Sequence, residues 1–407
     1  PYIMFAPPGN NLNALLINRG PSPGIVTQGV KIKYTIETGL GDPGSQSRFW
    51  DYAPDLFSRD IDPGTGLSGF GINGTMHSNQ TVFRARNVPV IPISKQQNFN
   101  PYPLYTLRAF DKESGELIAQ TRTVAPVSHE MRCDNCHGGN WQGDADIAPN
   151  KKTALDILQV HDKNNRTDLL SRAKNQKPVM CRECHSDPKQ ASPGNSSGNP
   201  EILNFSASMH GWHANYLTGR NQPACFNCHP DSKQVHTKGF RGTHSEAFSC
   251  IDCHGTMEDH AISLLKGARR DGRDVGKLIK HLQPRMAESK NEIKPRDPWI
   301  QEPDCLDCHQ DFKRPSLNAT AFNSWTGSAD KLYRNRNEIS GKINCAACHS
   351  SPHAIYPAKN LLFKDSRDTV QPLQYQDNNK TIGTDNCSLC HKMQMGFNYH
   401  HDNMIKN

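Results

Sequence analysis

The segment "CAACHSSPHAIYP", residues 345–357, places two cysteines, two histidines and a tyrosine within thirteen positions. Its first five residues are one copy of a pattern that recurs along the chain. All fourteen cysteines belong to seven C-x-x-C-H units, which we number motifs 1 to 7 in chain order. Seven units that leave no cysteine over indicate one repeated chemical purpose, which a single unit would not. The seven units are Cys133, Cys136 and His137; Cys181, Cys184 and His185; Cys225, Cys228 and His229; Cys250, Cys253 and His254; Cys305, Cys308 and His309; Cys345, Cys348 and His349; and Cys387, Cys390 and His391.

Covalent attachment of haem c explains the fixed spacing within each motif. The two thiols add across the two vinyl groups of one porphyrin, and the adjacent histidine then coordinates the iron from below the ring. A zinc site is the first alternative, but it needs four ligands and gives no reason for a histidine after every second cysteine. Disulfides are the second alternative, and they do not predict that histidine either. The motifs therefore predict seven covalently attached haems, with fourteen thioether cysteines and seven proximal histidines.

The composition fits a chain that folds around bound cofactors. Its 407 residues suggest two or more domains. Only 35% of the residues are hydrophobic and the mean hydropathy is −0.73, which is low for a chain that must bury a core. Seven porphyrins would supply the missing apolar mass. We therefore expect the chain without haem to be poorly ordered, as small metal-dependent domains are.

The formal net charge of +7 does not indicate a nucleic-acid partner once the cofactors are counted. Seven haems with ionised propionates contribute about −7 when oxidised and about −14 when reduced. Lys and Arg residues are therefore expected to pair with propionates. No stretch approaches eighteen apolar residues, so the sequence predicts no transmembrane helix. Because haem c is attached outside the cytoplasmic membrane, we expect an exported protein, its secretory signal removed, in the periplasm, on the cell surface or in the medium.

The motif-free first part of the chain predicts a β-rich domain over residues 1–125. Apolar and polar residues alternate in residues 30–37, and again in residues 104–110 and 117–124 on either side of the turn at 111–116. Frequent Gly and Pro between these runs indicate short strands and turns. We interpret this part as a small all-β sandwich that serves packing or docking.

The second predicted domain, residues 126–407, is a heptahaem cytochrome c domain of short helices and long loops wrapped around its haems. Helical spacing marks residues 153–163 and 261–270, whereas residues 187–200 are predicted to be a loop. Seven macrocycles in so short a stretch must be close neighbours, which predicts electron transfer between them. The gap of only 25 residues between His229 and His254 predicts a tight pair of haems at motifs 3 and 4.

Twelve of the nineteen histidines lie outside the motifs, so bis-histidine ligation of seven irons is the default expectation. His353 follows its own motif too closely to fold back over the same haem and should reach a neighbouring iron. His210 and His213 lie three apart, where one helix turn could present both to two haems. No histidine lies between His309 and His349, so motif 6 needs a distant ligand or leaves one iron open. The candidate distal ligands are His161, His210, His213, His236, His244, His260, His353 and His400.

The chain resembles the multihaem c-type cytochromes of anaerobic respiration, particularly those that metal-reducing bacteria use for extracellular electron transfer. The resemblance rests on the seven motifs and on the phrases "SMHGWHA", "CIDCHG" and "CAACHSSPHA", and it covers about residues 125–401. The last phrase also looks like the multihaem nitrite, hydroxylamine and tetrathionate enzymes. The chain departs from the nitrite reductase pattern because it has no C-x-x-C-K unit.

Three functions follow from this sequence-based interpretation, and the first is favoured. It is an electron carrier that uses seven bis-histidine haems and has no catalytic residue, with redox proteins, extracellular minerals or further copies of itself as partners. The alternative is an enzyme, a reductase of a small inorganic nitrogen or sulfur compound at one five-coordinate haem. In the third, the β-rich domain mediates assembly into a conducting cytochrome filament. Nothing in the chain predicts a nucleic-acid partner.

Overall fold

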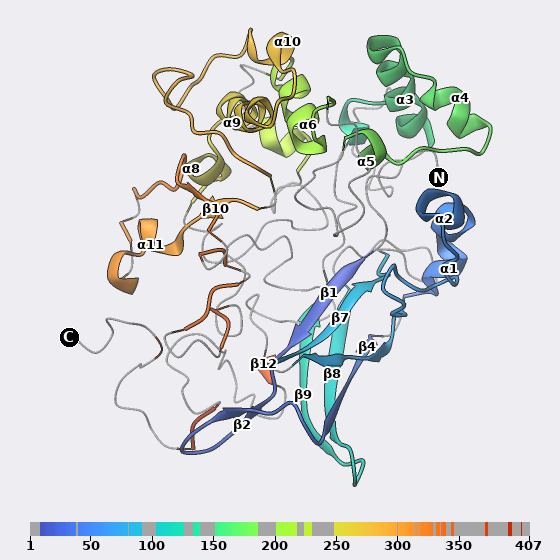
Figure 1. Cartoon of the computed structure of the whole chain (residues 1–407), viewed down its shortest axis with the longest axis vertical. Helices are drawn as coiled ribbons and strands as arrows, with labels where there is room; N and C mark the ends of the chain where they lie inside the picture. The colour runs from blue at the N-terminus through green and yellow to red at the C-terminus, as the bar shows by residue number, and fades with distance from the viewer. Residues whose placement is uncertain are drawn as a thin grey trace.

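In the computed structural model, the strands of the β-rich N-terminal part lie in the lower half of the view in Figure 1, and most of the helices lie in its upper half. None of the described residues lies in a helix that is long and apolar enough to cross a membrane. The structure describes residues 9–37, 40–79, 81–91, 103–125, 133–138, 151–185, 201–217, 224–229, 248–298, 300–313, 315–316, 318–328, 331–333, 335–338, 343–345, 371–372, 390–392 and 400.

The larger sheet is antiparallel and has the strand order β12-β9-β8-β4-β5. Its centre is the predicted set of alternating segments, with Ile32 opposite Ala109 and Leu107 opposite Thr121. The inward residues of β4 are buried and the outward ones exposed, as a period of two requires. The strands are β4 (Val30–Ile36), β5 (Gly74–Thr75), β8 (Leu104–Asp111), β9 (Leu117–Val124) and β12 (Gln371–Pro372).

A second antiparallel sheet has the order β1-β7-β6, and β2 pairs separately with β3. One buried cluster includes Leu12 and Phe83 from the smaller sheet and Tyr34 and Tyr105 from the larger one. Shared burial of this kind supports the predicted sandwich, which stays a prediction, whereas the β-sheets themselves are confirmed. These strands are β1 (Asn10–Ala14), β2 (Ile17–Asn18), β3 (Gly24–Ile25), β6 (His77–Asn79) and β7 (Val82–Val88).

The N-terminal part also contains two helices that the all-β expectation missed, α1 (Pro43–Gln46) and α2 (Phe49–Phe57). Helix α2 forms although Pro54 lies inside it, because its apolar face packs as a local cluster. Phe49 and Trp50 are buried there, and the Trp50 indole donates a hydrogen bond of 2.8 Å to the Thr65 carbonyl. The N-terminal part is therefore β-rich with a helical addition.

The rest of the described chain consists of short helices joined by irregular segments, as predicted. The helical spacing of residues 153–163 and 261–270 is confirmed by α3 and α9. The helices are α3 (Lys151–Asn165), α4 (Leu169–Lys174), α5 (Cys181–Cys184), α6 (Phe205–Ala214), α8 (Cys250–His254), α9 (Met257–Arg270), α10 (Gly276–Ile279) and α11 (Cys305–Cys308), with 3₁₀ turns η1 (Cys133–Asn135), η2 (Ala224–Asn227) and η3 (Gln310–Phe312) and the strand pair β10 (Glu302–Pro303) and β11 (Trp325–Thr326).

The apolar core of this part lies between α6 and α9. Leu264 and Leu265 of α9 are almost fully buried, and Leu265 packs over Gly211 of α6. A side-chain carbon added at Gly211 would lie 3.0 Å from Leu265 Cδ2, so the absence of a side chain lets the helices approach closely. This contact fixes the position of α6.

We expect Leu265→Ala to lower the free energy of unfolding by about 2–5 kcal/mol, because it leaves a cavity between α6 and α9. Denaturant titration followed by near-ultraviolet circular dichroism measures the change. The matched control is Leu117→Ala, whose side chain is 44% exposed, and it should change stability by less than about 0.5 kcal/mol. Equal midpoints for the two variants would contradict the assigned core.

Candidate metal centres

Motifs 1 to 5 each lie on a short helical turn, formed by η1, α5, η2, α8 and α11 in that order. Positions three apart on a helical turn lie on the same side of it. The two thiols of a C-x-x-C pair therefore lie side by side and can be joined to one rigid ligand. None of the cysteines in the described ranges takes part in a disulfide.

Burial changes the acidity of these thiols. It raises the pKa of Cys133 and of Cys181 to about 11 and that of Cys228 to about 12. Unmodified thiols at these positions are therefore mostly protonated at neutral pH. Within the described ranges, no group of three or more His, Cys, Asp or Glu side chains is arranged to hold a metal ion.

Each of four proximal histidines has another histidine ring nearby, and the distance between the two ring centres is nearly the same in all four pairs. Two imidazoles bound on opposite sides of one iron have ring centres about 6 Å apart, because each nitrogen lies about 2 Å from the metal and each ring centre about 1 Å further. The observed spacings match this geometry, so an iron fits between each pair. The centroid distances are 6.4 Å for His137 and His213, 6.2 Å for His185 and His161, 6.3 Å for His229 and His210, and 6.2 Å for His391 and His400.

The proximal histidine of motif 4 has a closer neighbour. The ring centre of His254 is 5.3 Å from that of His260, which is itself 4.6 Å from the ring of His210. Both contacts are edge-on. His260 Nδ1 is buried and has no hydrogen-bond partner among the described residues. The three rings form one cluster that joins motifs 3 and 4, which supports the tight pair predicted from the short gap between them.

Hydrogen bonds at Nδ1 leave the other ring nitrogen of several histidines available to a metal. A carbonyl oxygen can only accept, so a ring nitrogen that contacts one must donate, and the lone pair is then on Nε2. A neutral imidazole with a free Nε2 is the form that binds iron. The Nδ1–carbonyl distances are 2.8 Å from His185 to Leu203, 2.8 Å from His210 to Ser206, 2.8 Å from His213 to Met209 and 3.1 Å from His309 to Lys313.

Burial favours the neutral form of five of the paired histidine rings. It lowers the pKa of His210 to about 4 and lowers those of His161, His185, His213 and His229 as well. Desolvation disfavours the imidazolium form, and a metal ligand must be deprotonated. The residues of these motifs therefore fit haem iron held between two histidines.

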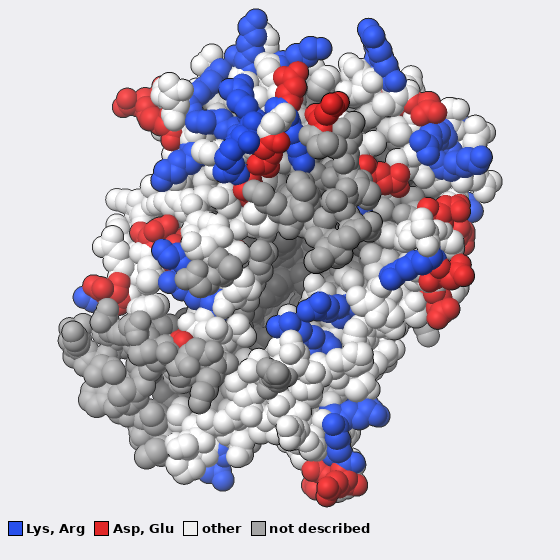
Figure 2. All heavy atoms as spheres, viewed as in Figure 1, with Lys and Arg blue, Asp and Glu red and all other residues white. Residues whose placement is uncertain are grey.

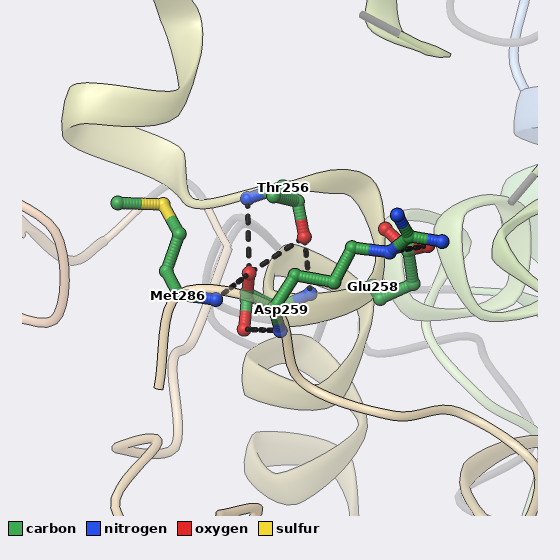
Figure 3. Close-up of polar contacts among 5 residues, drawn as sticks. Thr256, Glu258, Asp259 and Met286 are labelled. Atoms are coloured by element: carbon green, nitrogen blue, oxygen red, sulfur yellow. Dashed lines mark hydrogen bonds and ion pairs between the residues drawn. The ribbon is translucent and has the colours of Figure 1, made fainter. Parts of the chain in front are cut away.

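Helix α9 places His260, and a buried carboxylate fixes where that helix begins. Asp259 Oδ2 accepts hydrogen bonds from the Thr256 hydroxyl at 2.6 Å and from the Met286 amide at 3.1 Å (Figure 3). Thr256 is the N-cap of α9, and Glu258, two residues further along, forms an ion pair with Arg285 at 2.6 Å. The first turn is thus tied to the segment that follows α10, which fixes the direction of His260.

Motif 1 has a carboxylate at its proximal histidine. Asp156 Oδ2 on α3 lies 3.0 Å from His137 Nδ1 and also accepts from the Gly138 amide at 3.1 Å. A carboxylate at this nitrogen makes the imidazole a more basic ligand, which stabilises ferric over ferrous iron. Sequence reasoning did not identify Asp156, because nothing in the helix pattern separates it from an ordinary surface aspartate.

We expect Asp156→Asn to raise the midpoint potential of the haem at motif 1. A tenfold change in the relative affinity for the two iron states corresponds to about 59 mV for one electron, so the rise should be about 60 mV. Potentiometric titration with absorption readout measures it. Asp168→Asn, at an exposed aspartate before α4, is the control and should leave every midpoint in place. A fall in potential on Asp156→Asn would contradict this assignment.

Motif 4 differs because a cation lies at its proximal histidine. Arg296 Nη1 is 3.0 Å from His254 Nδ1, and the guanidinium stacks 4.2 Å from the ring centre of Trp325. Burial lowers the pKa of Arg296 to about 10, which leaves it charged at neutral pH. Sequence reasoning also missed Arg296, which lies between two motifs in a segment without regular spacing.

On the face drawn in Figure 2, Lys and Arg side chains gather over α9 and α10, with Asp and Glu side chains between them. Arg270 of α9 pairs with Asp297, and Arg269 of α9, Lys277 of α10 and Lys280, which follows α10, are exposed. Basic and acidic side chains are therefore intermixed over these helices.

The sequence-based candidates are only partly placed. His161, His210, His213, His260 and His400 each lie beside another histidine ring, as given above. The proximal His349, the thioether cysteines Cys348 and Cys387 and the distal candidates His236, His244 and His353 lie outside the described residues. The prediction that these residues hold haem and iron stays a prediction, as does the domain boundary after residue 125.

One comparison with known proteins gives a match. Residues 220–402, less than half of the chain, match the family model described as outer membrane cytochrome MtrC/MtrF-like, domains II/IV. The match contains motifs 3 to 7 and supports a multihaem cytochrome family of extracellular respiration. No curated protein and no solved structure matches the chain.

Proposed function

We propose that this protein carries electrons outside the cell through seven covalently attached haems, each held by a C-x-x-C-H motif. The observation that carries the proposal is the set of four histidine pairs whose ring centres lie 6.2–6.4 Å apart. Each haem, when bound, supplies a one-electron centre whose potential depends on its axial ligands. The chain's residues hold the ring, orient both imidazoles and set the local charge.

The axial pairs form the second part of the proposal. His213, His161, His210 and His400 serve as distal ligands of motifs 1, 2, 3 and 7 in that order. His260, whose ring centre is 5.3 Å from that of His254, is the nearest candidate for motif 4. Paired imidazoles fill both axial positions, so these irons bind no substrate and need no acid–base residue. This arrangement supports an electron carrier and gives no support to a reductase.

The similarity to outer membrane cytochromes supports a cell-surface or extracellular location. The partners would then be a redox protein that donates electrons and an extracellular acceptor such as a ferric mineral. Assembly of copies into a filament is the further prediction, and electron microscopy of the purified protein should show fibres. Single particles at all concentrations would contradict the filament and leave the carrier function in place.

The carrier function is tested on the purified holoprotein. Intact mass should exceed the polypeptide mass by seven haems, and the ferric spectrum should be low-spin. The protein is first reduced anaerobically. Mixing it with a soluble ferric chelate or with a ferric oxide should then reoxidise every haem. The reductase alternative is tested in the same way, with nitrite, hydroxylamine and tetrathionate as substrates. Catalytic turnover of one of these, with no reoxidation by ferric iron, would refute the proposal.

A further inference from the structure

We infer that the haems lie in a single file in the order of motifs 2, 1, 3, 4, 5, 6 and 7, so that spatial order departs from chain order at the first two motifs. The inference rests on the proposed function, because it takes the axial pairs as given. It is argued from contacts between described residues of successive motifs.

Motif 2 lies beside motif 1 because helix α3 contacts both. Asp156 Oδ2 on this helix is 3.0 Å from His137 Nδ1 of motif 1. His161 follows on the same helix, with its ring centre 6.2 Å from that of His185 of motif 2. Five residues of helix separate the two contacts, which is a rise of about 7.5 Å. The two haem sites are therefore neighbours.

Motif 1 continues to motif 3 across helix α6. The partners of the two motifs, His213 and His210, lie three residues apart on this helix, so their side chains share one face. The motifs also touch directly, since Asn135 Nδ2 donates a hydrogen bond of 2.8 Å to the carbonyl of Asn227. No other motif lies between them in this contact.

Motif 2 does not branch to motif 3, because the body of α6 lies between them. Ser208 Oγ on α6 is 3.0 Å from His185 Nδ1. Ser208 precedes His210 by two residues and His213 by five, which is about 200° and 140° around the helix axis, so motif 2 contacts α6 on the side away from both distal ligands. Its link to the file is therefore helix α3, which leads to motif 1 and not to motif 3.

Motif 3 is joined to motif 4 at two points. The His260 ring lies 4.6 Å from that of His210 and 5.3 Å from that of His254. The thiols of Cys225 and Cys250 hydrogen bond, and this contact is the largest cause of the raised pKa of Cys225. Cysteines from different motifs can touch only where the edges of two haems are adjacent.

Motif 4 leads to motif 5 through the small sheet of β10 and β11. Trp325 of β11 lies 6.3 Å from the ring of His254. Its register partner is Pro303, two residues before Cys305 of motif 5. An aromatic ring therefore lies between the proximal side of motif 4 and the start of motif 5.

Motif 5 leads to motif 6 through an ion pair. Asp304 caps α11 by accepting from the Leu306 amide at 3.1 Å, and it also pairs with the Arg336 guanidinium. The carbonyl of Arg336 accepts a hydrogen bond of 2.9 Å from the amide of Cys345 of motif 6. A single ion pair, Asp304 with Arg336, therefore links the two motifs.

Motif 6 leads to motif 7 and to the N-terminal part. Glu338 pairs with Ile343 through a backbone bond of 2.9 Å, close to motif 6, and its Oε2 lies 3.5 Å from His400 Nδ1. His400 lies beside His391 of motif 7, which bridges to Gly20 just after β2. The file therefore ends against the N-terminal part, and in Figure 1 the elements α5, α6, α8 and α11 follow this path around the molecule.

Marker ligands test the order. His161→Met should give the haem of motif 2 a methionine ligand, and His213→Met should do the same for the haem of motif 1. A haem with a methionine ligand has its own ferric absorption band and a raised potential. Each marker midpoint is then titrated in proteins that lack one neighbouring haem, with haem content verified by intact mass. The deletions are Cys133→Ala with Cys136→Ala for motif 1, Cys181→Ala with Cys184→Ala for motif 2, and Cys225→Ala with Cys228→Ala for motif 3.

Charge on a neighbouring iron shifts a midpoint, and the effect falls with distance. The marker at motif 2 should shift when the haem of motif 1 is removed and stay in place when that of motif 3 is removed. The marker at motif 1 should shift on removal of either the haem of motif 2 or that of motif 3. The reverse pattern, with the marker at motif 2 responding to both deletions, would show that the haems follow chain order and would overturn the inference.

If a deletion variant does not fold, a variant that keeps all seven haems provides the test. His210→Met raises the potential of motif 3, so this haem is reduced earlier and its charge should shift the marker at motif 1 but not that at motif 2. A response confined to motif 2 would overturn the order. If neither His161→Met nor His213→Met shows a methionine band, the axial pairs of the proposed function are wrong, which separates that failure from a wrong order.

Discussion

His210→Ala should convert one of the seven predicted haems from low-spin to high-spin in the ferric protein. The His210 ring lies 6.3 Å from that of His229 with an angle of only 9° between the planes, and its Nδ1 donates to the Ser206 carbonyl one turn earlier. The helix thus holds Nε2 in one direction. Removing the ring leaves the iron of motif 3 with His229 alone, and five-coordinate ferric haem is high-spin.

Electron paramagnetic resonance measures this change, with the high-spin signal expected to equal one seventh of the total haem. The midpoint potential of the same haem should also change, because axial ligation sets it. His281→Ala is the matched control, since His281 is exposed. A wholly low-spin spectrum for His210→Ala, with full haem content, would show that another residue binds this iron.

Most of the regular structure could be predicted from local periodicity. The alternation in residues 30–37 and the helical spacing in residues 153–163 are properties of the segment itself, and the structure has a strand and a helix there. Helix α2 was missed because Pro54 and the surrounding Gly and Pro residues indicate turns. Its stability comes from the packing of Phe49 and Trp50 against the segment that follows the helix, as far as Leu67, which the spacing within the helix itself does not reveal.

The candidate site likewise has a part that local sequence predicts and a part that only packing determines. Each C-x-x-C-H unit is local, so its chemistry can be read from one short segment. The pairing of His213 with motif 1 joins segments that only the packing of α6 brings together. The sequence offered His210 and His213 as a bridging pair, but it could not say which irons they reach. The charges at the proximal histidines, Asp156 and Arg296, depend on such packing too.

Arg296→Met is expected to lower the potential of the haem at motif 4, because it removes a buried cation beside that motif. The guanidinium can only donate, and Nδ1 of an iron-bound neutral His254 also donates, so the two groups cannot share a hydrogen bond once the metal is bound. Stacking on Trp325 keeps the charge near the site. A cation there favours ferrous over ferric iron, by on the order of 1–2 kcal/mol at an effective dielectric of about 20.

Arg296→Met should therefore lower the midpoint potential of one haem by about 40–90 mV, in the opposite direction to Asp156→Asn. Methionine keeps the length and the apolar stem, so packing on Trp325 is largely retained. Potentiometric titration of the two variants side by side gives the measurement, with Arg269→Met at an exposed position of α9 as the control for loss of charge. Opposite shifts in two different haems would mean that a carboxylate lowers the midpoint potential at motif 1 and a guanidinium raises that at motif 4. Electrons would then move from the α3 end of the file towards its middle. A shift of the same size in Arg269→Met would assign the effect to overall charge and contradict a local role for Arg296.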